Sequence, residues 1–387
     1  MERTTGLYRT TDLGGEQVRA FVPFPLPPER PPLLIDDPMR VLLDRAQSAI
    51  GRLDVAGKMV PSANWFLHGF VRKEAVISSQ IEGTQATLRD VLHFEATRQS
   101  LLPEDVEDVC NYVDALTYAR GEIVRPGGLP LSNRLLCGAH QRLMHGARGS
   151  EKTPGHVRTS QNWIGGTRPG NAIFVPPPAD EVPGALASLE QWIHNEASLA
   201  PLIRIGLAHV QFETIHPFLD GNGRIGRLLV ALLVEHWGLL DSPLLYISLP
   251  LKRRREEYYW RLASVRSEGD WEGWLMFFLE CVCEAADDGV QTAGKMFSQL
   301  NEDRRRLLDG SGATVSAIRL FERLPETPVV TLASAMELLQ TTKPTATSAI
   351  ETLVKTGVLR ETSGRKRDRV YAYHHYLAIL ASDTELA

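Results

Sequence analysis

Residues 216–227 read His-Pro-Phe-Leu-Asp-Gly-Asn-Gly-Arg-Ile-Gly-Arg, and the interpretation of the chain starts from this stretch. Within twelve residues it combines an imidazole, a carboxylate, three glycines, an amide and two guanidiniums. Glycines allow backbone N–H groups to turn toward an anion, and the helical pattern that follows would direct a positive helix N-terminus at the same anion. The stretch therefore predicts a nucleotide-phosphate site that contains its own base.

The charged side chains of the stretch suit three different tasks. Arg224 and Arg227 are three positions apart, so both lie on one face of a helix, and their planar guanidiniums match phosphate oxygens. Asp220 supplies one hard oxygen ligand, which is how Mg²⁺ is usually held when substrate phosphates and water complete its shell. His216 then remains as the proton acceptor.

The sequence before this stretch predicts a helix, which decides between alternative interpretations. The segment Pro201–Ile215 begins with proline and has helical apolar spacing. Its apolar positions are Leu202, Ile205, Ala208, Phe212 and Ile215. Gly221–Gly226 also matches the dinucleotide fingerprint G-x-G-x-x-G, but that motif must follow a buried strand. A plain glycine-rich turn between core helices is the other alternative, and it would need neither Asp220 nor Asn222.

His216–Arg227 matches the Fic family signature H-x-F-x-[D/E]-G-N-G-R-x-x-R at every specified position, and on this motif the chain resembles that family. The resemblance implies a mainly α fold with a Fic-type helical core and a small β-hairpin flap. It also implies transfer of AMP from ATP to a Ser, Thr or Tyr hydroxyl of a protein, which can be the enzyme itself, with Mg²⁺ as cofactor. Transfer of another nucleotide or phosphate-linked group stays open, because such a loop binds phosphates and not bases.

The resemblance implies a role for each position of the motif. His216 would deprotonate the target hydroxyl, Asp220 would bind Mg²⁺, and Phe218 would anchor the loop from the interior. The phosphates would lie against Gly221, Asn222, Gly223, Arg224 and Arg227. In-line transfer of this kind depends mainly on positioning and charge neutralisation, which these residue types provide.

Two further segments resemble Fic features outside the motif. Arg158–Pro176 contains two short extended runs joined by a turn rich in Gly, Pro and Asn, so a hairpin is expected. In the family such a flap holds the target as an added strand; a hairpin that only caps the helices is the alternative. The flap residues would be Trp163, Ile164, Phe174 and Val175. Tyr258–Arg266 resembles the helix that borders the adenine, with Tyr259 as the contact, although aromatic residues on helices are usually core.

A regulatory motif is expected upstream. Ser78-Ser-Gln-Ile-Glu-Gly83 ends a helix predicted at about residues 62–83, with glycine as the cap. It resembles the Fic inhibitory motif [S/T]-x-x-x-E-[G/N], in which Ser78 and Glu82 are the defining positions. The resemblance implies that Glu82 pairs with Arg227 and so competes with the γ-phosphate. Some relatives use the same glutamate to activate water and remove AMP, and the sequence does not separate the two roles.

Length and composition are compatible with an intracellular enzyme of several domains. A chain of 387 residues that is 43% hydrophobic exceeds what one core normally holds. We expect an N-terminal helical region at 1–105, a Fic core at 106–309 and a further domain at 313–387. The net charge of -5 argues against a nucleic-acid coat over the whole chain. No signal peptide or membrane span is recognised, so the cytoplasm is the expected location.

Neither the cysteines nor the remaining histidines predict a site. The cysteines lack C-x-x-C spacing and are expected to be reduced core residues; they are Cys110, Cys137, Cys281 and Cys283. His209, His374 and His375 have no metal-ligand spacing. The proline-rich residues 21–32 are expected to follow the core in extended form.

The C-terminal region resembles a winged helix. Helices are predicted at Ala313–Leu324, Leu332–Leu339 and Pro344–Thr356, followed by strands at Val358–Thr362 and Arg369–Tyr373. Thr345, Thr347 and Ser348 would be presented by the second helix of a helix-turn-helix, and the hairpin between the strands carries Arg365, Lys366 and Arg367, with Arg369 after it. DNA, a second copy of the chain and a protein substrate all remain open as partners, and a solvated turn is the plain alternative.

Two functions therefore survive. The first is an autoinhibited protein adenylyltransferase. The second is a DNA-binding regulator in which the Fic core senses a nucleotide and its transfer activity is secondary.

Overall fold

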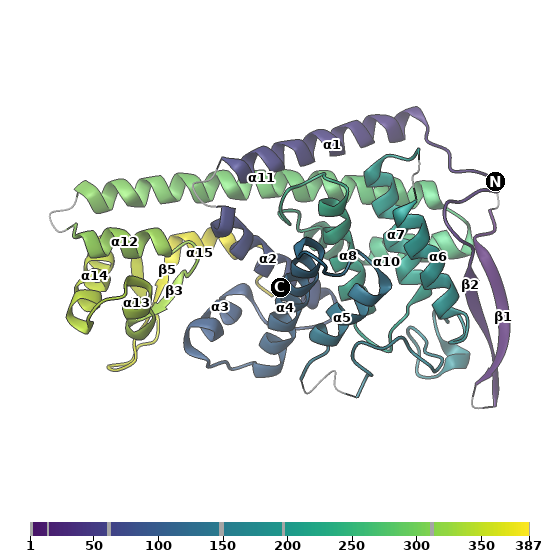
Figure 1. Cartoon of the computed structure of the whole chain (residues 1–387), viewed down its shortest axis with the longest axis horizontal. Coiled ribbons are helices and arrows are strands. Elements are labelled where there is room, and N and C mark those ends of the chain that lie inside the picture. Colours follow the sequence, from purple (N-terminus) through teal and green to yellow (C-terminus); the bar gives the residue numbers. More distant parts are fainter. Residues whose placement is uncertain are drawn as a thin grey trace. The chain divides into compact units, whose positions relative to one another are not determined.

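The computed structural model describes residues 3–13, 15–59, 63–146, 151–195, 198–309 and 313–386. The fold is mainly helical with small antiparallel sheets, which confirms the predicted fold class (Figure 1). The chain forms two compact units whose segments alternate along the sequence. Unit 1 comprises Met1–Gly51, Asn111–Pro243 and Ile247–Ala286, and unit 2 comprises Arg52–Cys110, Leu244–Tyr246 and Asp287–Ala387.

Unit 1 contains the predicted phosphate loop. Its elements are β1 (Gly6–Leu13), β2 (Glu16–Pro23), α5 (Asn133–Leu143), the 3-10 helix η1 (Pro169–Asn171), α6 (Val182–His194), α7 (Pro201–Ile215), α8 (Asn222–His236), α9 (Ser248–Arg253) and α10 (Arg255–Ser267). Three long helices have residues in both units: α1 (Asp37–Lys58), α4 (Pro103–Val124) and α11 (Trp271–Asp309).

Unit 2 contains the predicted inhibitory motif and the C-terminal region. Its elements are α2 (Ala63–Ile81), α3 (Leu88–Thr97), α12 (Val315–Arg323), β3 (Val329–Thr331), α13 (Leu332–Leu339), α14 (Lys343–Lys355), β4 (Leu359–Glu361), β5 (Val370–Tyr373) and α15 (His374–Leu380).

Helices α7 and α8 form the centre of unit 1, and the predicted helix–loop–helix frame is confirmed. Every residue of α7 from Leu202 to Ile215 is buried, so the helix is surrounded by protein. The two helices approach closely at Gly226, where a Cβ atom would collide with the carboxylate of Glu213. Trp274 of α11 donates its indole N–H to the Gly206 carbonyl oxygen at 2.8 Å, so α11 closes the other side of α7.

The N-terminal hairpin of β1 and β2 was not predicted. The strands pair antiparallel along their full length, from Gly6 opposite Pro23 to Leu13 opposite Glu16. Only the extended conformation of its last residues, Phe21–Pro23, was expected from the proline-rich pattern. The backbone N–H of Phe21 donates to the carbonyl oxygen of Val175 at 2.9 Å, so β2 lies against the predicted flap.

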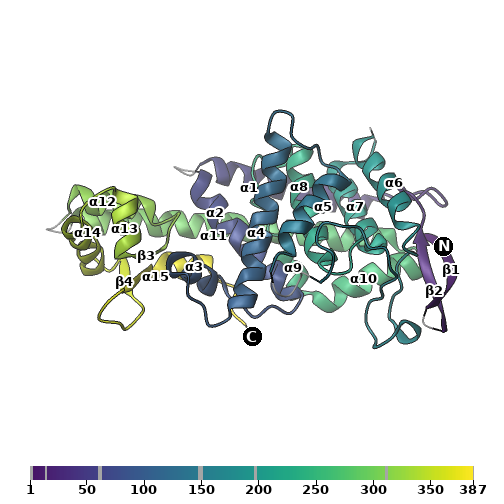
Figure 2. The ribbon, with the colours of Figure 1, turned by 60° about the horizontal axis from the view of Figure 1, so that its bottom comes forward.

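The C-terminal part of unit 2 contains every helix and strand predicted for it, within a few residues. The additional strand β3 completes a three-stranded antiparallel sheet of order β3-β5-β4. Figure 1 shows α12, α13 and α14 grouped with β3 and β5, and Figure 2 shows the loop between β4 and β5 as a long excursion from these helices. Tyr373 donates its buried hydroxyl to Asp303 of α11 at 2.9 Å, and burial together with this carboxylate raises the pKa of Tyr373.

The turn that carries Glu82 is held from two directions within unit 2. Helix α2 ends at Ile81 and Gly83 has a φ of 102°, as expected for a glycine cap. The Gln80 side-chain amide donates to the carbonyl oxygens of Ala86 at 2.9 Å and Thr384 at 2.7 Å, so the C-terminal segment fastens this turn. The predicted helix began at residue 62, which lies outside the described residues.

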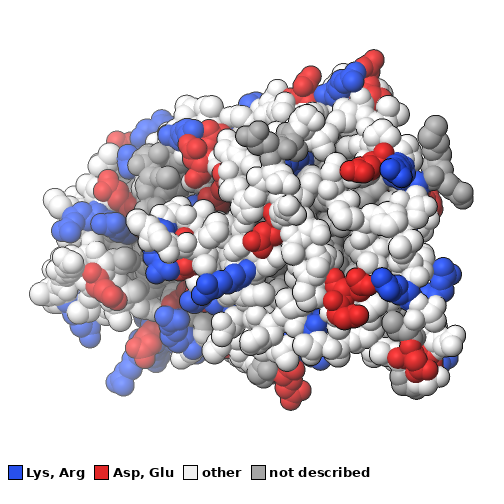
Figure 3. Space-filling model, turned by 45° about the vertical axis from the view of Figure 1, so that its right-hand side comes forward, with Lys and Arg blue, Asp and Glu red and all other residues white. Residues whose placement is uncertain are grey.

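Basic and acidic side chains are interspersed on the face shown in Figure 3, in keeping with the small net charge of the chain. No helix in the described ranges combines the length and the apolar character that crossing a bilayer requires. The four cysteines, all of them in described parts of the chain, form no disulfide; Cys281 and Cys283 are buried and the other two are half-buried.

Candidate functional site

His216 ends α7 and turns the chain into the loop. It adopts the left-handed conformation, with φ 49° and ψ 61°, while its backbone N–H donates to the carbonyl oxygen of Phe212 at 2.9 Å. Its ring is half-buried, and Nδ1 lies 3.4 Å from the carbonyl oxygen of Glu213. A non-glycine residue in this conformation is strained, so the surrounding structure must hold it there.

Arg158 provides that support, and sequence reasoning missed its role. Its side chain is buried and donates to the carbonyl oxygens of His216 at 2.9 Å, Ser160 at 3.1 Å and Pro177 at 2.6 Å. Burial lowers the pKa of Arg158 to about 10, so the guanidinium stays charged at neutral pH. Arg158 and His216 are 58 positions apart, and no local pattern in the sequence connects them.

Asn222 clamps the loop through its side chain. Its amide accepts a hydrogen bond from the backbone N–H of Phe218 at 2.8 Å and donates to the carbonyl oxygen of the same residue at 2.8 Å. Asn162 also donates to that oxygen, at 3.0 Å. Phe218 is buried, as expected of the loop anchor. The Asn222 side chain therefore shapes the loop, and its backbone N–H is the group left for the predicted contact with phosphate.

His140 of α5 backs the loop from the interior. Its ring stacks on Phe218 with centroids 3.8 Å apart and planes 5° from parallel. Nδ1 accepts from the backbone N–H of Gly155 at 2.9 Å, so the proton must be on Nε2, which donates to the carbonyl oxygen of Asp220 at 3.0 Å. Burial lowers the pKa of His140 to about 4, and the ring is neutral at pH 7. The sequence offered no signal for this residue.

Gly221 is required for two reasons. Its φ of 75° is a conformation that other residues adopt only with strain, and a Cβ atom would lie 2.8 Å from the sulfur of Met144. The backbone N–H of Gly221 donates to Oδ1 of Asp220 at 2.6 Å, which orients that exposed carboxylate. Its second oxygen, Oδ2, accepts no hydrogen bond from any described residue, so the carboxylate can still take a cation.

The first turn of α8 supplies donors for an anion. Among the described residues, the backbone N–H groups of Asn222, Gly223 and Arg224 have no hydrogen-bond partner, as is usual at a helix start. The Nε atom of Arg224 is buried and likewise has no partner in the described chain. A buried donor without an acceptor is costly, by about 1–3 kcal/mol, and a phosphate oxygen would remove that cost. Arg227 lies on the same helix and is almost fully buried.

Tyr259 and the predicted flap lie outside the loop. Tyr258 of α10 is buried and donates its hydroxyl to buried His209 at 2.8 Å. The next residue, Tyr259, is 41% exposed. The flap is present as one antiparallel pair, with Ile164 N–H donating to the Phe174 oxygen at 2.8 Å. Trp163 of this hairpin is exposed and Val175 is buried. The structure thus leaves Tyr259 and Trp163 accessible and turns Tyr258 and Val175 inward.

Comparison with known proteins agrees with this geometry. The family described as "Fic/DOC family N-terminal" matches residues 41–120, and the "Fic/DOC family" matches residues 130–234. Residues 41–120 and 130–234 are thus similar to the Fic/DOC family. Solved Fic structures share the fold: a Fic family protein from Desulfovibrio desulfuricans G20 has a TM-score of 0.58 at 24% identity, over 88% of this chain and 97% of that one. A Fic domain protein from Bacteroides thetaiotaomicron has a TM-score of 0.52 at 18% identity, over 65% of this chain and 97% of that one.

Similar sequences carry a more specific name. A protein from Drosophila grimshawi named protein adenylyltransferase Fic is 26% identical over 267 residues, which is 65% of this chain and 49% of that protein. The protein of the same name from Drosophila virilis is 24% identical over 269 residues, with the same shares of 65% and 49%. The chain thus spans about half the length of the curated relatives that it matches.

The stretch His216–Arg227 contains one carboxylate, that of Asp220. Within the ranges that the structure describes, no group of three or more His, Cys, Asp or Glu side chains is arranged to hold a metal ion. The predicted residues from His216 to Arg227 are contiguous in one loop and the first turns of α8, and Arg158, His140 and Asn162 support that loop from outside the motif.

We predict that Asn222→Ala destabilises the loop because it removes two buried hydrogen bonds, each worth about 1 kcal/mol, and leaves the Phe218 backbone N–H unpaired. The expected loss is about 2–3 kcal/mol in denaturant unfolding. Asn162→Ala is the matched control, since it removes a single bond to the same residue. If both variants lose the same stability, the two-way clamp is not the important contact.

We also predict a pH dependence from His140. Its folded pKa of about 4 lies below the ordinary value of 6.5, so the unfolded chain takes up the proton first as the pH falls. The stability contributed by the neutral ring is complete above pH 6.5 and declines toward pH 4, by up to about 3 kcal/mol. His140→Gln should flatten the unfolding free energy across this window relative to exposed His145→Gln. Parallel pH profiles for the wild type and the His140 variant would contradict this account.

Proposed function

We propose that this chain is a protein adenylyltransferase that transfers AMP from ATP to a Ser, Thr or Tyr hydroxyl of a protein, including its own chain. Three features support the proposal: the buried, unpartnered Nε of Arg224, the uncommitted N–H groups that start α8, and the His216 ring in the same loop. Of these, the Arg224 donor carries most weight, because a buried cationic donor without a partner indicates a missing anion. The Drosophila relatives named protein adenylyltransferase Fic support the same activity.

The chemistry follows from the order of groups along the loop. The target hydroxyl oxygen attacks the α-phosphorus, and His216 takes its proton. The bond between the α-phosphorus and the bridging oxygen breaks, and pyrophosphate leaves with the negative charge. The backbone N–H groups of Asn222 and Gly223 and the guanidiniums of Arg224 and Arg227 would stabilise that charge. The protein's contribution is then alignment of the two oxygens and neutralisation of charge.

Asp220 would hold Mg²⁺. Its Oδ1 is oriented by the Gly221 N–H and its Oδ2 has no partner among the described residues, which fits a cation held by one carboxylate and by substrate phosphates. The ion supplies charge neutralisation at the phosphates. Asp220 itself would position that charge beside the start of α8.

Protein targets would dock on the flap. Its backbone is paired at Ile164 and Phe174, and exposed Trp163 and Ile173 precede the two paired residues. A target segment added as a strand is recognised through its main chain, so the proposal does not require one target sequence. Tyr259, which is exposed on α10, would border the adenine.

We further propose that Glu82 restrains the activity. Support comes from the motif Ser78–Gly83, from the buried position of Ser78 inside α2, and from the tight turn that Gln80 holds at its end. A carboxylate that pairs with Arg227 would occupy the guanidinium that the γ-phosphate needs. Activation of water by the same carboxylate, to remove AMP from a target, is the second role open to Glu82.

We predict that Glu82→Gly raises self-labelling with AMP by at least about tenfold, because a competing ion pair of about 1.4 kcal/mol or more is removed. Gln85→Gly is the control, since it loosens the same turn without removing a carboxylate. His216→Ala should abolish labelling in either background. Intact-mass measurement after incubation with each nucleoside triphosphate identifies the added group.

The outcomes of that experiment are distinct. Equal labelling by the wild type and the Glu82 variant would remove the regulatory proposal while leaving the transfer reaction in place. Added mass that corresponds to a different nucleotide would replace adenylyl transfer with transfer of that group. Labelling that survives His216→Ala would contradict the assigned base.

We predict that Asp220→Asn removes the extra thermal stabilisation that Mg²⁺ gives to the ATP complex. The amide can still accept from the Gly221 N–H, so the loop should keep its shape, but it carries no charge for the ion. The measurement is the melting temperature with ATP alone and with ATP and Mg²⁺. Asp180→Asn, at an exposed acidic position of unit 1, is the control. A Mg²⁺ effect that persists in Asp220→Asn would place the ion elsewhere.

A further inference from the structure

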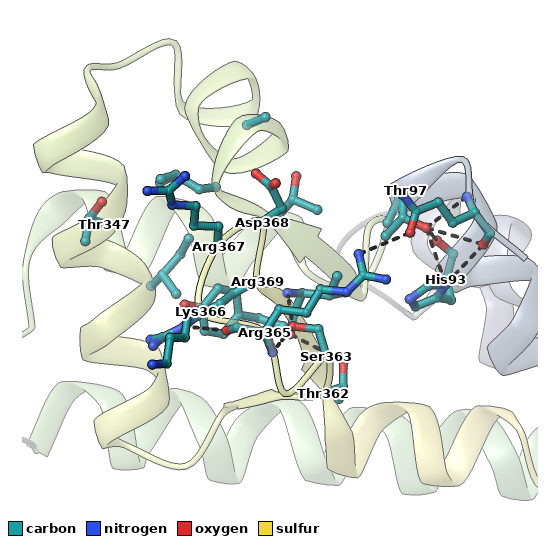
Figure 4. Close-up of a pocket in the computed structure, with 18 of the residues that line it drawn as sticks. His93, Thr97, Thr347, Thr362, Ser363, Arg365, Lys366, Arg367, Asp368 and Arg369 are labelled. Carbon is teal, nitrogen blue, oxygen red and sulfur yellow. Dashed lines mark hydrogen bonds between the residues drawn. The ribbon is translucent and has the colours of Figure 1, made fainter.

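A second polar hollow lies entirely within unit 2. It has a volume of about 1400 Å³. One wall is the end of α3 with the loop that follows, including His93, Thr97 and Gln99. The opposite wall is α14 with the loop between β4 and β5 (Figure 4). Neither the Fic motif nor the proposed transfer reaction uses this hollow.

Basic side chains dominate the hollow. Five line it, from two different elements, against three acidic ones. The basic residues are Lys343, Arg365, Lys366, Arg367 and Arg369, and the acidic residues are Asp90, Glu351 and Asp368. Asp90 is already committed, because it accepts hydrogen bonds from the N–H and the hydroxyl of Thr87 at 2.9 and 2.6 Å. The balance therefore favours an anionic ligand.

Three of the five cations are unengaged. Through their side chains, Lys343, Lys366 and Arg367 form no hydrogen bond or ion pair with the described residues. Arg365 donates to the side chain of Gln99 at 3.2 Å, and Arg369 donates to the Arg365 carbonyl oxygen at 3.1 Å. Figure 4 shows Arg367 and Thr347 on the same side of the hollow, with Arg365 reaching toward the segment that carries His93 and Thr97.

The loop between β4 and β5 is held in shape from within. The carboxylate of Glu361 accepts from the backbone N–H groups of Ser363 at 2.8 Å and Gly364 at 3.0 Å, and also from the Ser363 hydroxyl. The Ser363 hydroxyl is the main cause that lowers the pKa of Glu361. A loop whose base is fixed in this way presents its arginines at a defined spacing, which reduces the entropy lost on binding.

Helix α14 contributes a second, independent feature. It follows α13 after three residues, with Gln340 in the left-handed conformation at φ 48°, which is the arrangement of a helix-turn-helix. The N-cap Thr342 makes no side-chain cap bond, so the positive helix start is open. Lys343 and Thr347, one turn apart near this start, both line the hollow.

We propose that this hollow binds the phosphate backbone of double-stranded DNA, with α14 entering the major groove and the β4–β5 loop on the adjoining phosphates. In a helix-turn-helix the second helix reads the groove while basic side chains around it position the duplex. Among the described lining residues, Tyr371 is the only Phe, Tyr or Trp. A binding site for single-stranded nucleic acid usually offers several aromatic rings on which unpaired bases stack, so this lining does not favour a single strand. The order α12-β3-α13-α14-β4-β5 is that of a winged helix, and a duplex is the ligand that engages both its helix and its loop.

The test is fluorescence anisotropy of the full chain with a labelled mixed-sequence duplex about two helical turns long, across a series of salt concentrations. Lys343→Glu and Arg367→Glu should each weaken binding by about tenfold and lower the slope of log affinity against log salt by about one. Lys355→Glu, at the other end of α14, and Arg360→Glu, on β4, are matched controls outside the hollow. Melting curves establish that each variant folds.

Every outcome bears on the proposal. Salt-dependent binding of the duplex that falls in the hollow variants and persists in the controls supports it. Absence of duplex binding at low salt overturns it, as does an equal loss in all four variants. Tighter binding of a single-stranded RNA or of a Glu-rich peptide than of the duplex also overturns it. Self-labelling with ATP is not a readout here, so failure of the DNA site is distinguishable from failure of the transferase.

Discussion

The two hydrogen bonds between the Asn222 amide and the backbone of Phe218 are the interaction on which the site depends. They close a tight loop between a helix that ends at Ile215 and another that starts at Asn222. Each bond contributes about 1 kcal/mol, but an unpaired buried backbone group would cost more. Because opening the loop would leave buried backbone groups unpaired, the closed loop is the stable conformation. The closed loop includes the strained backbone of His216 and the left-handed Gly221.

The loop is also fastened from outside the motif, and each support acts on a backbone carbonyl or a buried ring. Arg158 holds the His216 oxygen, His140 holds the Asp220 oxygen, and the His140 ring covers Phe218. None of these three contacts uses the side chain of His216 or of Asp220. A site organised in this way is shaped before a ligand arrives, so binding need not first order the loop.

The parts of the site that are close together in sequence were predictable, and those that meet through the fold were not. The helical spacing of α7 and the glycines of the loop act over a few residues, so the frame and the motif could be read directly. Arg158, His140 and Asn162 come from distant segments and satisfy backbone groups, for which single-sequence patterns carry no signal. The same reason hid the N-terminal hairpin, because its contact with the flap is a main-chain bond between Phe21 and Val175. Asn222 is predicted to lie against phosphate, and the sequence gives no indication that its side chain clamps the Phe218 backbone.

Unit 2 brings together two features that the sequence had presented separately. The turn of Glu82 is fastened by Thr384 near the C-terminus, and α3, which begins six residues after Glu82, forms one wall of the basic hollow. Within this unit, Gln80, which lies two residues before the proposed inhibitory glutamate, is thus in direct contact with the segment that follows α15. The turn of Glu82 and the basic hollow therefore have defined positions relative to each other inside unit 2.

The central claim is that the start of α8 and Arg224 together form a phosphate cradle beside His216. The most direct measurement is a crystal structure of the Glu82→Gly protein with a non-hydrolysable ATP analogue and Mg²⁺. The account predicts bridging phosphates against the N–H groups of Asn222 and Gly223, a phosphate oxygen within hydrogen-bond distance of Arg224 Nε, and the His216 ring facing the α-phosphorus. A nucleotide bound elsewhere, or an Arg224 that remains unpaired beside bound phosphates, would contradict it.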